Sequence, residues 1–208
     1  MLKIWGRTTS SNVQKVMWAV GELGLAHERI DIGGPFGGNK DPDYLARNPN
    51  GLVPTLEEDD GFLLWESNSI VRYLAATYGP GPLEPADARE RARAGQWMDW
   101  QLTIAGPAII PVFWQLVRTP PEQRDEAAIA AGKAKSIAAF GIADAALART
   151  PYLAGDAFSY GDIPVAVMAR RFLELVAERP AFPNLERWYA AIDARPAFRE
   201  HVASIPMV

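Results

Sequence analysis

The stretch NPNGLVPTL at residues 48–56 and the stretch LWESNSIVRYL at residues 64–74 together decide the fold expected for this chain. Residues 52–56 predict a short strand with a proline near its start, and residues 59–61 (DDG) predict a turn into a paired strand at 62–65. Apolar residues then recur at helical spacing over 67–78. The predicted centre of the first domain is therefore a hairpin that leads directly into a helix.

The residues before this hairpin alternate between strand and helix patterns. Residues 2–5 predict a strand, the polar cluster at 8–12 predicts a helix start, and residues 13–23 predict a helix that ends at Gly24. Residues 27–32 predict a second strand, 33–39 a glycine-rich loop, and 41–47 a short helix. The predicted order is β-α-β-(α)-β-β-α, which indicates a small mixed sheet with helices.

The residues after the connector GPGP, at positions 79–82, show helical spacing only. Helices are predicted at about 86–118, 122–148, 160–178, 184–194 and 196–203, with a bend near Gly106 and Pro107. The fold class expected is α/β plus all-α: a mixed-sheet domain at 1–80, a linker at 81–87 and a five-helix domain at 88–208. Ser159 and Asp162 have capping-box spacing, so we assign them to helix folding.

Composition narrows the chemistry that the chain can perform. Its 208 residues carry 21 Lys and Arg against 25 Asp and Glu, so the basic face that nucleic-acid binding needs is not expected. With no cysteine and two histidines, we expect no disulfide, no thiol nucleophile and no metal site. Neither a signal sequence nor a long apolar run is visible. We therefore expect a cytoplasmic protein, without membrane or nucleic-acid partners, whose chemistry uses hydroxyls, amides, carboxylates or a reactive group supplied by a co-substrate.

Three motifs, in the right order over essentially the whole chain, resemble the cytosolic glutathione transferase superfamily. They are the two stretches quoted above and FSYGDIPVA at residues 158–166. The chain is most similar to bacterial, serine-type members of the theta and beta kind. The resemblance implies a thioredoxin-like first domain, glutathione as co-substrate and a two-fold homodimer. It also implies a cis peptide bond between Val53 and Pro54.

The family pattern further implies which residues bind the cysteinyl and glutamyl parts of glutathione. Leu52, Val53 and Pro54 match the segment whose backbone pairs with the cysteinyl part. Ser67 would hold the α-carboxylate of the γ-glutamyl group, since a helix N-terminus has free amides and a positive dipole, and Glu66 would pair with its ammonium. The alternative for Ser67 is a simple helix cap.

Asn39 and Lys40 fall where relatives place a polar or basic residue near the glycyl carboxylate of glutathione. A lone lysine in a glycine-rich loop is more often merely solvated. The preceding GGPFGG run lacks the ending of a phosphate loop, so nucleotide binding has no support.

Ser10 is the first candidate for the catalytic residue, because it lies where serine-type relatives carry their hydroxyl. A hydroxyl that donates to the glutathione sulfur stabilises the thiolate, and the helix N-terminus adds to this effect. Ser11 or Asn12 could serve instead, since an amide donor would play the same part. The alternative is that the cluster at 8–12 only caps the helix.

Phe113 and Trp114 are the candidates for an apolar pocket that binds the electrophile, although their spacing also fits a packed core. The expected function is transfer of glutathione to a hydrophobic electrophile in detoxification. One alternative is a narrower glutathione-dependent lyase, isomerase, dehalogenase or disulfide reductase. Another is a non-catalytic protein that binds glutathione or other ligands, because fold alone does not dictate function.

Overall fold

The computed structural model describes residues 1–79 and 83–208, and the chain divides into two compact units. One unit comprises Met1–Glu84 together with Pro196–Pro206, and the other comprises Pro85–Arg195 together with Met207–Val208. Residues 80–82, which include the start of the predicted linker at 81–87, lie outside the described residues. The predicted domain bounds, 1–80 and 88–208, stay a prediction.

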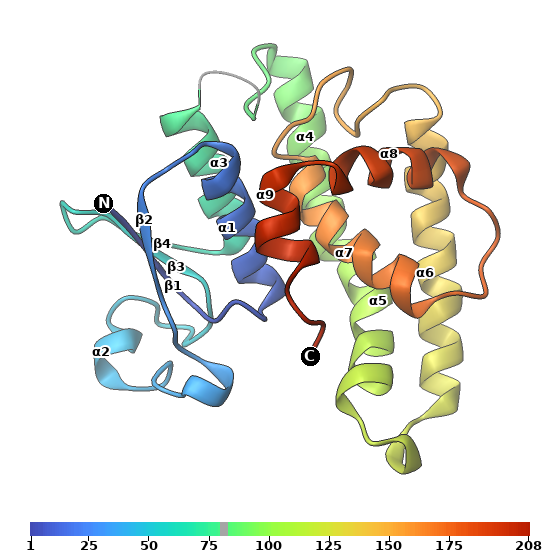
Figure 1. The fold of residues 1–208 in the computed structure, drawn as a ribbon, viewed down its shortest axis with the longest axis horizontal. Helices are drawn as coiled ribbons and strands as arrows, with labels where there is room; N and C mark the ends of the chain where they lie inside the picture. Colours follow the sequence, from blue (N-terminus) through green and yellow to red (C-terminus); the bar gives the residue numbers. More distant parts are fainter. Residues whose placement is uncertain (80–82) are drawn as a thin grey trace. The chain divides into compact units, whose positions relative to one another are not determined.

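The N-terminal unit is built on a mixed sheet, as the alternating patterns predict (Figure 1). Strand order is β2-β1-β3-β4, with β1 parallel to β2 and antiparallel to β3, and β3 antiparallel to β4. Its elements are β1 (Leu2–Trp5), α1 (Ser11–Glu22), β2 (His27–Ile30), α2 (Pro42–Leu45), β3 (Thr55–Glu57), β4 (Leu63–Trp65) and α3 (Ser67–Tyr78). This is the arrangement of a thioredoxin-like domain.

The predicted strand at 52–56 is wrong at its beginning, because β3 starts only at Thr55. Pro54 has no N–H for a sheet hydrogen bond, and the peptide bond before it is cis. Residues 52–54 therefore remain outside the sheet and end the loop that precedes it. The second strand is also shorter than predicted, since β2 ends at Ile30.

Helix α1 forms the core of this unit and is buried along most of its length. It packs against α3 and against the last helical segment, α9 (Pro196–Phe198) with the π-helical turn Arg199–Ala203. The rings of Trp18 and Phe198 meet edge to face with centroids 4.8 Å apart. Residues 196–206 therefore pack with the N-terminal unit, although the predicted helical domain includes them.

The second unit is helical, as predicted. It contains α4 (Ala88–Trp100), α5 (Gly106–Phe113), α6 (Glu126–Leu147), α7 (Asp162–Leu175) and α8 (Pro183–Asp193). Asp87 caps α4 by accepting from the amides of Arg89 and Glu90, and Asp125 caps α6 by accepting from that of Ala128 at 2.9 Å. The fold matches the expected class, α/β followed by all-α.

Residues 88–118 form one long helical run whose hydrogen bonding changes around its prolines. The irregularity nearest the expected bend is the π-helical turn Gln101–Ala105, which ends just before Gly106. Because Pro107 has no N–H to donate one turn back, a wider turn at this point is the expected response. By length and composition alone this run could cross a membrane. Part of this run packs against α6 and α7 of the same unit, while Leu102, Ile104 and Trp114 remain exposed.

Candidate active site

Two buried polar side chains, those of Asn48 and Tyr44, donate hydrogen bonds to the loop before β3. The Asn48 amide donates to the carbonyl oxygen of Leu52 at 2.9 Å and to the hydroxyl of Thr55 at 3.2 Å. The Tyr44 hydroxyl donates to the same Leu52 oxygen at 2.7 Å. Because each donor is fixed by burial, the loop presents a defined backbone rather than a set of conformers.

The peptide bond between Val53 and Pro54 is cis, as the family pattern implies. Pro54 is buried, Val53 is half-buried and Leu52 is 61 % exposed. Leu52 and Val53 thus lie just before β3, at one end of the sheet.

The residues at the start of α3 have unusual backbone geometry. Helix α3 begins at Ser67, and the residue before it, Glu66, has φ 72°, the only positive value outside glycine in the described residues. A left-handed conformation is costly for a residue with a Cβ, and such costs concentrate at functional sites. The Glu66 side chain is exposed, whereas Ser67 is buried. This geometry leaves the first amides of α3 unpaired within the helix.

The N-terminus of α1 lies beside that of α3. The hydroxyl of Ser67 donates to Oδ1 of Asn12 at 3.4 Å, a long hydrogen bond between residues 55 positions apart. Two positive helix ends therefore meet at one place, which favours an anionic ligand there. Together with the loop before β3 they enclose a small recess. Its lining residues are Asn12, Asn48, Asn50, Leu52, Val53, Pro54, Glu66 and Ser67.

Ser10 occupies the N-cap position of α1, with extended backbone, but its side chain makes no capping hydrogen bond. The interpretation of the 8–12 cluster as a simple cap therefore does not explain Ser10. Ser11 is the first residue of the helix and is half-buried. Of the three predicted candidates only Asn12 is among the residues that line the recess.

Asn39, which is half-buried, and Lys40, which is exposed, both donate hydrogen bonds to the loop before β3. The Asn39 amide donates to the carbonyl of Gly51 at 2.8 Å, and the Lys40 ammonium donates to that of Asn50 at 3.2 Å. Gly51 has φ 59°, and a Cβ there would lie 2.7 Å from Nζ of Lys40 and 2.8 Å from the carbonyl oxygen of Asn39. The two side chains thus fix the backbone near the recess without lining it.

Comparison with known proteins identifies the family. The family model for the glutathione S-transferase N-terminal domain matches residues 9–77, and that for the C-terminal domain matches residues 105–196. Glutathione S-transferase GstB of Escherichia coli (strain K12) is 45 % identical over 208 residues, with all of both chains covered. The chain belongs to the glutathione S-transferase family. Glutathione S-transferase 3 of Zea mays is 35 % identical and covers 99 % of this chain, which spans 95 % of that protein.

A solved structure is similar to this transferase over its entire length. It is the theta class glutathione S-transferase of Xanthomonas axonopodis pv. citri with glutathione bound, at 46 % identity and a TM-score of 0.94. The alignment covers 100 % of this chain and 99 % of the other.

Phe113 and Trp114, the predicted electrophile pocket of the transferase, lie in the helical unit at the end of α5 and the start of the π-helical turn Trp114–Arg118. Phe113 is buried, and Trp114 is 52 % exposed. Their ring centroids are 6.4 Å apart at an interplanar angle of 72°. Only the second ring is therefore open to solvent.

Three residues of the transferase were missed as functional candidates. Asn48 and Asn50 line the recess. Both belong to the NPNGLVPTL motif, so the sequence already indicated that they lie near the site. Lys15 is fully buried on α1, with its ammonium 3.5 Å from Oδ1 of Asn68 in the first turn of α3. In the sequence, Lys15 could have been singled out because it interrupts the apolar pattern of this helix.

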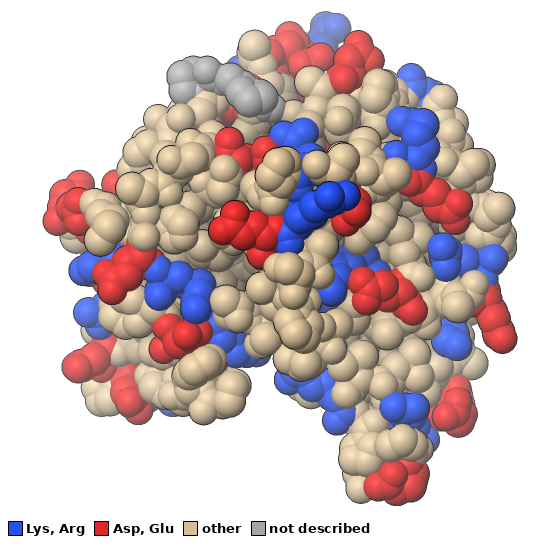
Figure 2. Space-filling view, in the orientation of Figure 1, with Lys and Arg blue, Asp and Glu red and all other residues tan. Residues whose placement is uncertain are grey.

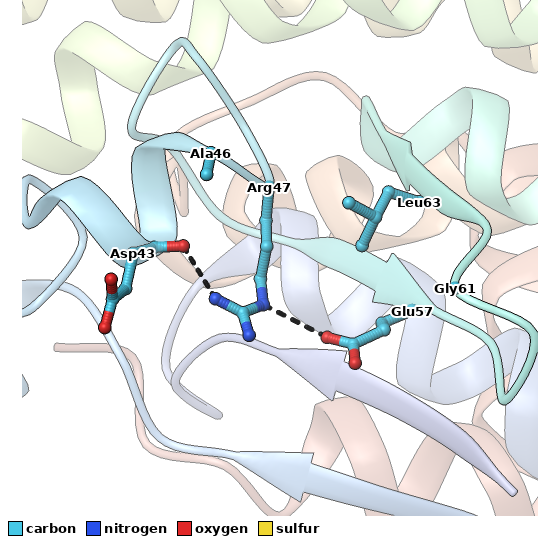
Figure 3. A pocket seen from close by; sticks show the side chains of 6 residues that line it. All are labelled: Asp43, Ala46, Arg47, Glu57, Gly61 and Leu63. Carbon is cyan, nitrogen blue, oxygen red and sulfur yellow. Dashed lines mark hydrogen bonds and ion pairs between the residues drawn. The ribbon is translucent and has the colours of Figure 1, made fainter.

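A second hollow, of about 390 Å³, lies beside α2 and is lined by both charged and apolar residues (Figure 3). Arg47 spans it, donating from Nε to Glu57 at 3.1 Å and from Nη1 to the carbonyl of Asp43 at 2.6 Å. Burial alone would raise the pKa of Glu57, but hydrogen bonds from Arg47, Lys3 and Trp5 outweigh it and hold the pKa below its ordinary value. This satisfied network anchors α2 to the sheet and is not a reactive site.

Charged side chains of both signs intermix on the face of the molecule shown in Figure 2. Among residues 1–79 and 83–208, no group of three or more His, Asp or Glu side chains could hold a metal ion. The polar groups at the recess are side-chain amides, the Ser67 hydroxyl and helix ends, which can hold an anion by hydrogen bonding, and the Glu66 carboxylate, which can pair with a cation.

Proposed function

We propose that this chain binds glutathione in the recess between α1, α3 and the loop before β3, and transfers it to a hydrophobic electrophile. The recess carries this proposal, because two helix N-termini and the cis-proline loop gather there. Glutathione has an anionic end and a peptide backbone, and these two features fit free helix amides and an exposed loop backbone.

Each proposed contact with glutathione has a physical basis. The α-carboxylate of the γ-glutamyl group accepts from Ser67 and the first amides of α3, and the ammonium pairs with Glu66. The cysteinyl backbone pairs with Val53, flanked by Leu52 and Pro54. Asn39 and Lys40 support the loop, and Lys40 can turn toward the glycyl carboxylate.

The protein supplies no thiol of its own, so its task is to make the glutathione thiol ionise. A free thiol has a pKa of about 8.5. A hydroxyl that donates to the sulfur anion contributes roughly 1.5–3 kcal/mol, and a helix N-terminus about 0.3–1 kcal/mol. Since one pKa unit is about 1.4 kcal/mol, these effects lower the thiol pKa by roughly one to three units. The thiolate then attacks the electrophilic carbon and forms a C–S bond; in a substitution such as that on a chlorodinitrobenzene the C–Cl bond breaks and chloride leaves, and the thiol proton goes to solvent.

Ser10 is the proposed donor to the sulfur, with Ser11 and Asn12 as the alternatives. The Ser10 hydroxyl is not used as a helix cap, so it is available for a ligand. Asn12 already accepts from Ser67 through Oδ1, but its amide N–H groups could donate. Phe113 and Trp114 are proposed to bind the electrophile, in a cytoplasmic homodimer that acts in detoxification.

The test measures how the rate of conjugation of a chlorodinitrobenzene depends on pH. Ser10→Ala should raise the apparent pKa of bound glutathione by one unit or more, while calorimetric affinity for glutathione stays nearly intact. Ser11→Ala and Asn12→Ala are the matched controls. If the pH–rate profile is unchanged in Ser10→Ala but shifts in Ser11→Ala or Asn12→Ala, the residue whose substitution shifts the profile is the donor to the sulfur. Absence of both binding and conjugation in the unmodified protein would refute the proposed function.

A further inference from the structure

Arg171 on α7 is a half-buried guanidinium without a polar partner among the described residues. Its Cζ lies 4.0 Å from the centroid of the Phe113 ring, a cation–π contact. Neither a hydrogen bond nor an ion pair joins it to another side chain in the described chain. Its neighbour Arg170, in contrast, pairs with Glu174 at 2.8 Å. The charge of Arg171 is therefore not balanced by the protein.

Arg118 adds a second positive charge at the same place. Its Cζ lies 5.5 Å from the Phe113 centroid and 5.2 Å from the Trp114 centroid. Its polar contact is a hydrogen bond to the main-chain oxygen of Val208 at 2.5 Å. Burial, and the nearby charges of Arg118 and Arg170, lower the pKa of Arg171 to about 10, so it stays protonated at neutral pH.

Arg171 is half-buried and has no carboxylate partner among the described residues, whereas Arg118 is exposed and already donates to the terminal main-chain oxygen of Val208. Arg171 loses hydration through burial, and its charge repels the like charge of Arg118. An anion that binds between them would relieve both costs. A guanidinium stacked on an aromatic ring keeps the N–H groups in its plane free, and this fork fits a carboxylate through two parallel hydrogen bonds. The exposed ring of Trp114 offers a flat apolar surface beside the charges.

We propose that Arg171, assisted by Arg118, binds a carboxylate on the second substrate, so that aromatic acids with an electrophilic carbon are favoured over neutral analogues. The inference rests on the proposed electrophile pocket at Phe113 and Trp114. Arg171 then determines substrate specificity, whereas residues of the N-terminal unit promote ionisation of the glutathione thiol.

The kinetic test compares a chloronitrobenzoate with the carboxamide of the same ring, in the full-length protein with glutathione saturating. The ratio of kcat/KM for the acid over the amide should fall roughly 10- to 100-fold in Arg171→Gln. Arg171→Lys should fall less, because it keeps the charge and loses the fork. Arg170→Gln removes the same charge from the adjacent position and should leave the ratio unchanged. An unchanged ratio in Arg171→Gln would overturn the proposal.

A binding measurement separates this inference from the proposed reaction. Calorimetric titration with a nitrobenzoate is made with glutathione saturating, so that the helix N-terminus of α3 is already occupied. Nitrobenzoate should bind more tightly than nitrobenzamide, and Arg171→Gln should abolish the difference even if no electrophile is conjugated. Equal binding of the acid by Arg171→Gln and the unmodified protein, with equal unfolding midpoints, would refute the anion site whatever the activity.

Discussion

At the scale of single residues, Ser67 combines burial with a weak internal bond. Its hydroxyl is in a buried side chain, yet the hydrogen bond to Asn12 is 3.4 Å long. A long bond contributes little to stability, so the hydroxyl retains most of its capacity for a ligand. The Glu66 backbone at φ 72° places this hydroxyl and the first α3 amides together at the recess.

Ser67→Ala should therefore weaken glutathione binding roughly 10- to 100-fold, because a hydrogen bond to a charged group is lost. The free energy of unfolding should change by less than about 1 kcal/mol, as expected for a weak neutral bond. Calorimetric titration and urea unfolding measure the two quantities. Ser67→Thr keeps the hydroxyl and should retain binding; equal affinity in the Ala variant would remove Ser67 from the site.

At the scale of elements, the loop before β3 depends on a glycine. Gly51 has φ 59°, and the side chains of Asn39 and Lys40 bind the carbonyls on either side of its amide. A side chain at this position meets both an unfavourable backbone region and the carbonyl oxygen of Asn39 at 2.8 Å. The loop conformation that presents Leu52 and Val53 therefore requires glycine.

Gly51→Ala should lower the free energy of unfolding by about 2 kcal/mol or more, because strain and a steric clash add. Gly24→Ala is the matched control, since Gly24 has φ 62° and open space, with no atom within 4 Å, where a Cβ would lie. Gly24→Ala should lower the free energy of unfolding by about 1 kcal/mol, because only the backbone conformation is unfavourable there. Urea unfolding measures both. Equal costs would show that the contact with Asn39 and Lys40 does not constrain the loop.

The capping box at the start of α7 has a different geometry from the usual one. Asp162 accepts from the amide of Ser159 at 2.9 Å, as the acid of a capping box does. The Ser159 hydroxyl accepts from Gly161 at 3.3 Å rather than from the residue three positions on. Asp162 also accepts from the amide of Leu153 and from Nε1 of Trp188. The motif thus joins three segments of the helical unit.

At the scale of the whole molecule, Asp162 should make stability depend on pH. Burial raises the pKa of Asp162 to about 6 from its ordinary value of 3.8, although its four donors oppose this effect. The folded state therefore binds a proton more tightly than the unfolded state. Stability from this group is fully present below the ordinary value and is lost as the pH rises through about 6.

The free energy of unfolding should fall by roughly 2–3 kcal/mol between pH 4 and pH 7 through this one carboxyl group. Urea titrations across this range, followed by tryptophan fluorescence, measure the slope. Asp162→Asn cannot ionise, so it should lose this part of the slope even though the substitution itself is destabilising. The same slope in both proteins would assign the effect to other carboxylates.

Several features of this transferase could be predicted from local sequence. Helical spacing predicts α3 at the residues that the structure shows, and the three motifs imply the family and the cis bond at Pro54. The lack of cysteine already excluded a thiol nucleophile of the protein's own. These features are readable because backbone periodicity, turn residues and composition are properties of neighbouring residues.

Other features were decided only by the tertiary structure. The hydrogen bond between Ser67 and Asn12, the stacking of Arg171 on Phe113, and the packing of Phe198 on Trp18 each join distant residues. Periodicity shows that such side chains are buried or exposed, but not which of them meet. The meeting of two helix ends, and the unpaired guanidinium, depend on how packed elements orient their side chains. The sequence alone therefore determined the elements and the family, and packing determined which groups form the sites.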